Sequence, residues 1–331
     1  MNIFEKLAHF VKEVFKTNLE IFLEALKLSP NAQGYVSGSV TELLLKNKLE
    51  GKYGFEVKRI REKWEGLKHL NHHGDFYFRK PTDSLWFVME SKGVKSNSEK
   101  WHSLYNYGDL KRFLIYHADK ITWIDKQSEI EPQITSWINE NLPKFQNEYE
   151  STLYRYDDIQ KYILKLPKRE TNKSRAISAL QEHDREQISS LISERLNYVK
   201  SKLRVLETHF VAGRSKASLR TQATPRKDEF NIVSVDIFLK YSEHKFLFAN
   251  PNHLDSSGSD PNHIQQNYII GFVFIDDSGN EILSITEDWY DDLNEVYETL
   301  TFENAIIEED MQVDNRRVVP IDEADVEIDV E

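Results

Sequence analysis

Apolar residues alternate with polar ones in several short stretches and recur every three to four residues in others, which predicts a chain that mixes strands with amphipathic helices. Residues 2–28 have the helical period, and the Ser-Pro-Asn-Ala-Gln-Gly sequence at 29–34 is expected to end these helices. A further helix is expected from Ser39 to Glu50, a strand from Phe55 to Arg61, and a β-hairpin from His73 to Gly93.

The rest of the chain continues this mixture. The expected elements are a helix near 98–117, a short strand at 121–124, helical segments within 137–149, 157–166 and 171–210, hairpins at 231–249 and 268–285, and a helix near 288–300. The long helix at 171–210 either joins two domains, forms a dimer seam, or folds onto its own domain. Beyond Glu308 the composition predicts disorder, because acidic residues dominate it.

The hairpin at His73–Gly93 has charged residues at one end of an otherwise hydrophobic element. Asp75 is in the first strand, and alternation places Glu90 and Lys92 on one face of the second. Buried charge is costly unless it is paired or holds a metal, and carboxylate oxygens are the ligands that Mg²⁺ prefers. The plainer alternative is an exposed Asp75 and a cross-strand Glu–Lys pair.

The spacing of Asp75, Glu90 and Lys92, with fourteen residues between the two carboxylates, resembles the PD-(D/E)XK nuclease superfamily, to which many restriction endonucleases belong. The resemblance covers about residues 35–125, where the expected order is helix, strand, strand, strand, helix, strand. It implies an α/β fold with a restriction-endonuclease-like αβββαβ core and a central mixed sheet, followed by a helical segment and a C-terminal α/β region. The sequence departs from the family motif at Gly74, where that motif has proline.

The resemblance also implies a function, that of a Mg²⁺-dependent endonuclease such as a type II restriction enzyme. Asp75 and Glu90 would bind the metal, and Lys92 would position the nucleophilic water. Glu42, in the helix expected at 39–50, would complete the metal site unless it is a solvated surface residue. Asp83 is a rival first carboxylate, but it lies in the turn at the other end of the hairpin.

The same resemblance implies double-stranded DNA as the partner and a homodimer as the assembly. Two alternatives stay open. One is a DNA-binding or regulatory protein that keeps this fold without cleaving, and the other is a nuclease that acts on RNA, on branched structures or in repair.

Charge is unevenly distributed along the chain, whose formal net charge of −12 at first argues against a nucleic-acid ligand. Residues 276–331 contain 20 acidic and two basic residues, whereas residues 1–275 contain 35 acidic and 41 basic ones. A segment at 211–227 has no acid and is expected to contact DNA, with a flexible linker as the alternative. Its basic residues are Arg214, Lys216, Arg220, Arg226 and Lys227.

Histidines offer two weaker possibilities. Those at 69, 72 and 73 are compatible with zinc, but their spacing matches no standard site, which favours a polar loop. A second catalytic site formed by Asp236, His253 and His263 matches no nucleophilic arrangement. A role of the polar loop at 250–267 in substrate recognition is favoured instead.

Cysteine is absent, which excludes disulfides and thiolate metal sites and is compatible with a reducing cytoplasm. The N-terminal stretch has a charge every few residues, so we expect neither a signal peptide nor a membrane span there, and no membrane partner. The expected organisation is a nuclease core with N-terminal helices at 1–150, a helical connector at 151–210, a β-rich recognition region at 211–305 and an acidic tail at 306–331.

Overall fold

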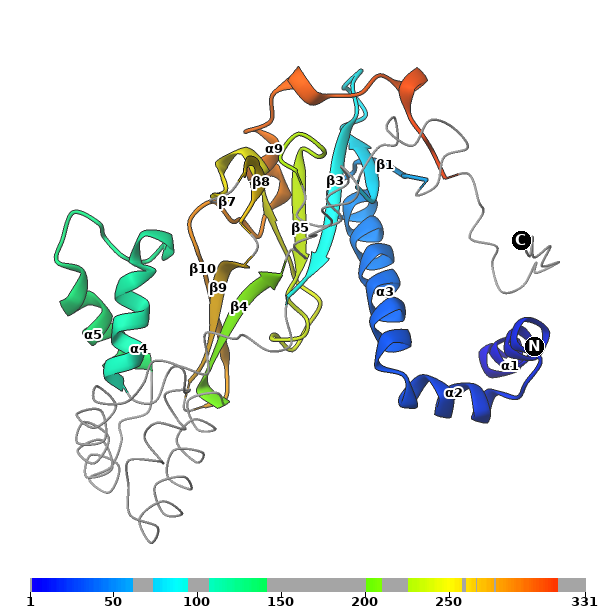
Figure 1. Ribbon diagram of the computed structural model, residues 1–331, viewed down its shortest axis with the longest axis horizontal. Coiled ribbons are helices and arrows are strands. Elements are labelled where there is room, and N and C mark those ends of the chain that lie inside the picture. The colour runs from blue at the N-terminus through cyan, green and yellow to red at the C-terminus, as the bar shows by residue number, and fades with distance from the viewer. Residues whose placement is uncertain are drawn as a thin grey trace, which may run out of the picture. The chain divides into compact units, whose positions relative to one another are not determined.

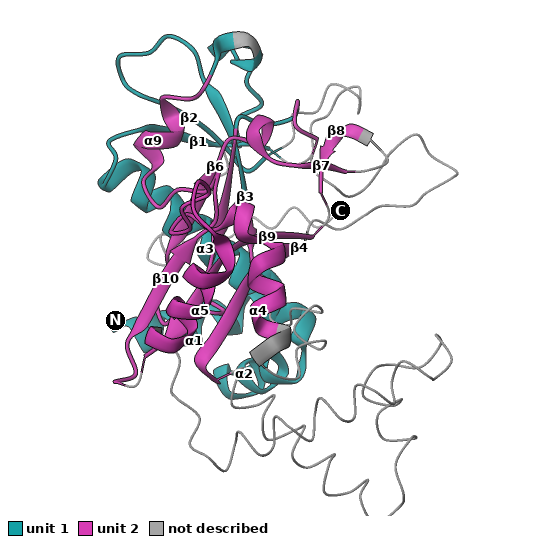
Figure 2. Ribbon diagram, turned by 90° about the vertical axis from the view of Figure 1, so that its left-hand side faces the viewer, with its two compact units in different colours: residues 1–91, 229–231, 301–331 teal, residues 92–228, 232–300 magenta. Residues whose placement is uncertain are grey.

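The computed structural model describes residues 2–61, 74–94, 107–141, 201–209, 226–257, 260–265, 267–276 and 278–314. These residues form a mixed α/β fold (Figure 1). The chain divides into two compact units, coloured separately in Figure 2. Unit 1 comprises residues 1–91, 229–231 and 301–331, and unit 2 comprises residues 92–228 and 232–300. This division differs from the four segments expected from composition.

Three helices begin unit 1: α1 (Ile3–Phe15), α2 (Leu19–Leu28) and α3 (Pro30–Gly51). Each starts at a polar side chain that accepts a hydrogen bond from a backbone N–H three residues later, namely Asn2, Asn18 and Ser29. The interruption between helices that was predicted at residues 29–34 is therefore longer than the observed one. Pro30 occupies the first helical position, where the backbone N–H has no partner within the helix and the fixed φ of proline suits a helix. Helix α3 can therefore begin at Pro30, and only Ser29 separates it from α2.

A three-stranded antiparallel meander follows in unit 1. Its strands are β1 (Glu56–Arg59), β2 (Phe76–Arg79) and the first part of β3 (Phe87–Gly93), as the alternation predicted. The register places Tyr77 opposite Lys58 on one side and Val88 on the other. Helix α3 packs against β1, and its Leu45 and Leu49 are fully buried.

Residues 301–314 complete unit 1, although they are distant from it in sequence. They contain the 3₁₀ turns η5 (Phe302–Asn304) and η6 (Glu308–Asp310). Ile306 forms an antiparallel bridge with Trp86, and Val313 forms one with Ile60 beside β1. The expected disorder beyond Glu308 is therefore wrong up to Asp314, because an open strand edge offers unpaired backbone groups for pairing. Residues 315–331 lie outside the described part.

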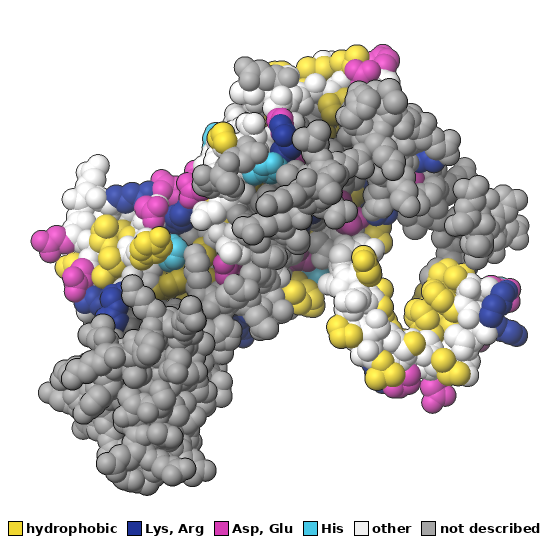
Figure 3. Space-filling model, viewed as in Figure 1, with side chains coloured by type: hydrophobic (Ala, Val, Ile, Leu, Met, Phe, Trp, Pro, Cys, Tyr) yellow, Lys and Arg dark blue, Asp and Glu magenta, His cyan; other side chains and the backbone are white. Residues whose placement is uncertain are grey.

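Large apolar side chains are exposed along α1–α3, and Figure 3 shows them in yellow over these helices. Phe4 is 73% exposed, Leu28 81% and Tyr35 81%. A contiguous apolar patch on a protein surface is typical of a contact with another chain or segment. None of the described helices is both long and apolar enough to span a membrane.

Unit 2 combines two helices with several antiparallel strands. Its elements are α4 (Tyr107–Tyr116), η3 (Ala118–Lys120), α5 (Ile130–Asn141), β4 (Leu203–His209), β5 (Ile232–Asp236), β6 (Phe246–Ala249), η4 (Pro251–His253), β7 (Ser256–Ser257), β8 (Asp260–Ile264), β9 (Asn267–Ile275), β10 (Glu281–Ile285) and α9 (Leu293–Tyr297). The hairpins β5–β6 and β9–β10 are as predicted, and α9 is shorter than predicted. Strands β10, β9 and β4 form one sheet in that order.

The core of unit 2 lies between α4, α5 and the sheet of β4 and β9. Leu114, Ile134 and Phe272 are fully buried within it. At Gly271, β9 runs so close to β10 that a Cβ atom would lie 2.5 Å from the Ser284 carbonyl oxygen. Only glycine therefore allows this approach.

Two expectations about unit 2 are wrong. Within the helix predicted at 171–210, residues 203–209 form strand β4 instead, because pairing with β9 overrides local helical preference. Residues 171–200 lie outside the described part, as do the predicted helix at 157–166 and residues 142–149. The strand predicted at 121–124 is a turn after η3, in which only Ile121 makes a bridge. Ile121 and Ile124 are both buried, which a turn achieves as well as a strand does. The expected order of helix, three strands and helix is thus present, but the final strand of the αβββαβ core is not formed at 121–124.

Candidate active site

The candidate site lies at the end of the β2–β3 hairpin that begins with Gly74 and Asp75. Gly74 has φ +108°, a conformation that glycine adopts readily. Proline cannot adopt it, because its ring fixes φ near −65°. The Asp75 backbone is then held on both sides. Its N–H donates to the Met89 carbonyl at 2.9 Å, and its own carbonyl accepts from Ile60 N–H at 3.0 Å. The departure from the family motif at position 74 therefore has a conformational reason.

Asp75 lies close to Glu90 at the end of the β2–β3 ladder. The strand register ends at the pair of Phe76 with Met89, and Asp75 is a bend residue just before β2. The Asp75 N–H donates to the carbonyl of Met89, the residue before Glu90. The Asp75 carboxylate is also fixed, since its Oδ2 accepts from the N–H of Ser91, the residue after Glu90, at 2.6 Å. Asp75 is thus held beside the segment of β3 that contains Glu90.

Lys92 follows Glu90 by two residues on β3 and shares its face. The first three residues of β3 are buried, whereas Glu90, Ser91 and Lys92 are all partly exposed. The charged end of the hairpin is therefore the end that solvent reaches. A small ion, water and a phosphate group need that access.

Glu42 lies on α3 and is ion-paired with Arg59 of β1, with Oε2 2.7 Å from Nη2. The carboxylate is only 22% exposed and already has a cationic partner. Among the residues that the structure describes, no three His, Asp or Glu side chains form a group that could hold a metal ion. A metal site here would therefore consist of Asp75 and Glu90, with water or substrate oxygens as the other ligands.

Tyr77 on β2 connects the hairpin to residues 301–314, a link that the sequence did not predict. Its hydroxyl accepts from Gln312 N–H at 3.0 Å, and burial raises the pKa of the phenol above its usual range. Nearby, Lys58 forms an ion pair with Glu308. The segment that completes unit 1 thus contacts the strands that hold the candidate site.

The basic residues expected to contact DNA lie only partly within the described chain. Arg226 donates to both carboxylate oxygens of Asp228 at 2.8 and 2.7 Å, which lowers the pKa of that carboxyl. Lys227 donates to the Leu254 carbonyl at 2.5 Å. Both cations are thus engaged within the protein in this structure. Arg214, Lys216 and Arg220 lie outside the described residues, as do the histidines at 69, 72 and 73.

Asp236 is buried in unit 2, where its partner is His244. The two side chains are 2.6 Å apart, Oδ2 to Nδ1, and Phe238 N–H donates to the other carboxylate oxygen at 3.1 Å. The histidines that the sequence grouped with Asp236 are on other elements, His253 on η4 and His263 on β8. The hairpin predicted at 231–249 could have indicated this pair only through closeness, because the β5–β6 register pairs Asp236 with Phe246 and His244 precedes β6 by two residues.

Comparison with family models, with curated proteins and with solved structures finds no match to this chain.

Proposed function

We propose that this protein is a metal-dependent DNA endonuclease, of the type II restriction class, that hydrolyses phosphodiester bonds. The observation that supports the proposal is the position of Asp75 at the solvent-accessible end of a hydrophobic hairpin, where it bonds to the residues on either side of Glu90, with Lys92 two residues further along β3. This is the arrangement that the resemblance to PD-(D/E)XK nucleases implies for its catalytic residues.

The chemistry follows from these three side chains. Asp75 and Glu90 provide hard oxygen donors, which fit Mg²⁺. When bound there, Mg²⁺ would polarise the phosphodiester and lower the pKa of a coordinated water. The hydrogen bond from Ser91 N–H keeps one Asp75 oxygen in a fixed orientation. Lys92 would orient the attacking water and offset the negative charge that develops on the phosphorane.

Cleavage assays with the purified chain test the proposal. With Mg²⁺ and a mixture of double-stranded DNA substrates we expect discrete fragments, and with EDTA in place of Mg²⁺ we expect none, because both carboxylates act through the ion. Random fragments, or a preference for RNA, branched or single-stranded substrates, would favour a repair or structure-specific nuclease. If no DNA or RNA is hydrolysed with Mg²⁺ or Mn²⁺, the protein is instead a binding protein without nuclease activity.

The proposal includes a homodimer, because cutting both DNA strands at one sequence commonly uses two subunits. The exposed apolar side chains of α1–α3 support an additional contact between chains. Light scattering is expected to give twice the 39.0 kDa mass of the chain. Replacing Leu28, which is 81% exposed, by Glu should shift the protein toward monomer. A wild-type monomer at assay concentrations would contradict this part of the proposal and leave the cleavage chemistry untouched.

A further inference from the structure

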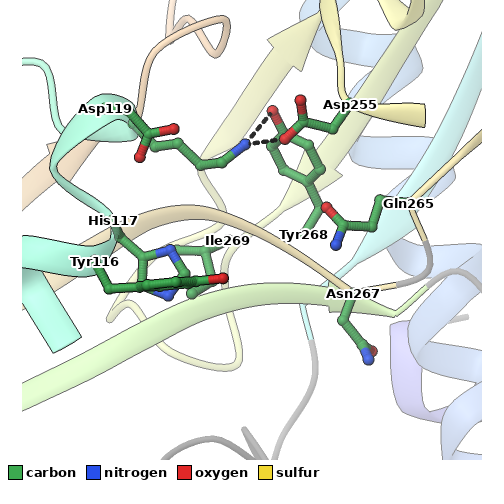
Figure 4. Close-up of a pocket in the computed structure, with 9 residues that line it drawn as sticks. Tyr116, His117, Asp119, Asp255, Gln265, Asn267, Tyr268 and Ile269 are labelled. Atoms are coloured by element: carbon green, nitrogen blue, oxygen red, sulfur yellow. Dashed lines mark hydrogen bonds and ion pairs between the residues drawn. The ribbon is translucent and has the colours of Figure 1, made fainter. Parts of the chain in front are cut away.

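Unit 2 contains a polar pocket of about 270 Å³ near the end of α4, the segment just after η4 and the start of β9. Figure 4 shows Asp255 and Tyr268 side by side in the lining of this pocket. Lys120 is ion-paired with Asp255, and its ammonium donates to the Tyr268 hydroxyl at 3.2 Å. The ammonium also lies 4.4 Å from the centre of the Tyr268 ring. One wall of the pocket is thus a connected group of three polar side chains.

The charges in this wall balance one another. Burial alone lowers the pKa of Lys120, but Asp255 and Tyr268 outweigh that effect, so the pKa lies above its usual range and the amine stays charged. Asp255 neutralises this charge, and Asp119 adds a second carboxylate to the lining. The pocket therefore has no excess positive charge, which makes it unsuited to a phosphate group.

Backbone hydrogen bonds hold this wall in place before any ligand arrives. The Lys120 carbonyl accepts from Glu287 N–H at 2.6 Å, and the Asp255 carbonyl accepts from Gln265 N–H at 3.0 Å. Tyr268 is 2% exposed and belongs to strand β9. Pockets for small molecules are usually preformed in this way, because ordering the site on binding would weaken affinity.

The other lining groups combine flat rings with primary amides. Tyr116 and His117 lie together, away from Asp255 (Figure 4), with ring centres 4.8 Å apart in an edge-to-face arrangement. Tyr116 is 78% exposed, so its ring is available for stacking. The side chains of Gln265 and Asn267 complete the lining and offer both donors and acceptors.

We propose that this pocket binds a single nucleobase, either in a nucleoside or at an unpaired position of a nucleic acid. A base is neutral and flat, and its edge presents donors and acceptors that primary amides match. Its face stacks on aromatic side chains such as Tyr116. The volume lies just below the about 300–1,000 Å³ of pockets for drug-sized ligands, which fits one base better than a dinucleotide. The choice of a base over other flat polar ligands rests on the proposed nucleic-acid function.

Titration calorimetry with adenosine, guanosine, cytidine and thymidine tests this proposal on the full chain. We expect saturable binding of at least one nucleoside. Tyr116→Ala should weaken it at least about fivefold, whereas Tyr116→Phe should bind like wild type because the ring is kept. Gln265→Ala should weaken it about threefold to tenfold, as expected for one lost neutral hydrogen bond. Lys126→Ala removes a lysine that pairs with Glu287 outside the pocket lining and should have no effect.

The outcomes separate this proposal from the nuclease activity. The titrations contain no metal ion and are repeated with Glu90→Gln, so nucleoside binding is measured whether or not the protein cleaves DNA. Binding of inorganic phosphate that Tyr116→Ala leaves unchanged would overturn the assignment to a base. The absence of binding by all four nucleosides at millimolar concentration, with circular dichroism showing folded protein, would overturn it as well.

Discussion

Lys92→Ala is expected to lower Mg²⁺-dependent DNA cleavage at least about a hundredfold, because a positioned side chain that assists proton transfer or offsets charge in the transition state contributes about that much or more. Glu90→Gln should have an equal or larger effect, since the amide provides one neutral oxygen where the metal requires an anionic ligand. Single-turnover cleavage of a labelled duplex measures both losses. DNA affinity, measured in Ca²⁺ by fluorescence anisotropy, should change little for Lys92→Ala.

Matched controls come from the opposite end of the same hairpin. Lys80→Ala and Asp83→Asn remove the same kinds of charge in the turn between β2 and β3, and both variants should cleave at the wild-type rate. If Asp83→Asn abolishes cleavage and Asp75→Asn does not, Asp83 is the first carboxylate. If Lys92→Ala cleaves as wild type does, the assigned role of the lysine is wrong.

Gly74→Ala is expected to lower the free energy of unfolding by about 2–4 kcal/mol, which combines the backbone penalty of a positive φ with an overpacked core. A Cβ atom at this position would lie 2.5 Å from Val88 Cγ1 and 3.2 Å from the Met89 carbonyl oxygen. Val88 is buried and β-branched, so its methyl group has few alternative positions. Urea denaturation monitored by tryptophan fluorescence measures the loss.

Gly54 provides the comparison that isolates the steric part. It has φ +70°, and a Cβ atom there would meet nothing within 4 Å, so Gly54→Ala should cost only the backbone penalty of about 1–2 kcal/mol. Gly74→Ala should also reduce cleavage in the surviving folded protein, because Asp75 is the next residue. Equal destabilisation by the two substitutions would show that the contact with Val88 is not what excludes a side chain at position 74.

Local patterns predicted the strands of the hairpin well. Alternation located β1, β2 and β3 and placed Glu90 and Lys92 on one face, since these properties depend only on the period of a strand. The sequence pattern could not predict that position 74 requires glycine, because this depends on how closely Val88 approaches Gly74.

The incorrect predictions, and the contacts that the sequence did not indicate, involve residues far apart in the sequence. Strand β4 was predicted as helix because Leu203 and Leu206 also fit a helical period, and only pairing with β9 decides between the two. The ion pair of Glu42 with Arg59 depends on how α3 packs on β1. The pocket at Lys120 joins residues from 116 to 269, so no local pattern could indicate it.

The bridge between Ile60 and Val313 has a consequence for synthesis on the ribosome. Strands β1, β2 and β3 leave the ribosome early, yet the residues that pair with Ile60 and Trp86 are made more than two hundred residues later. At about 5–20 residues per second, the edge of β1 stays uncovered for roughly 13–50 s. During that time the nascent chain would have an open strand edge, which a chaperone or the neighbouring nascent chain can bind. Unit 1 of this protein is therefore completed only after translation has passed residue 313.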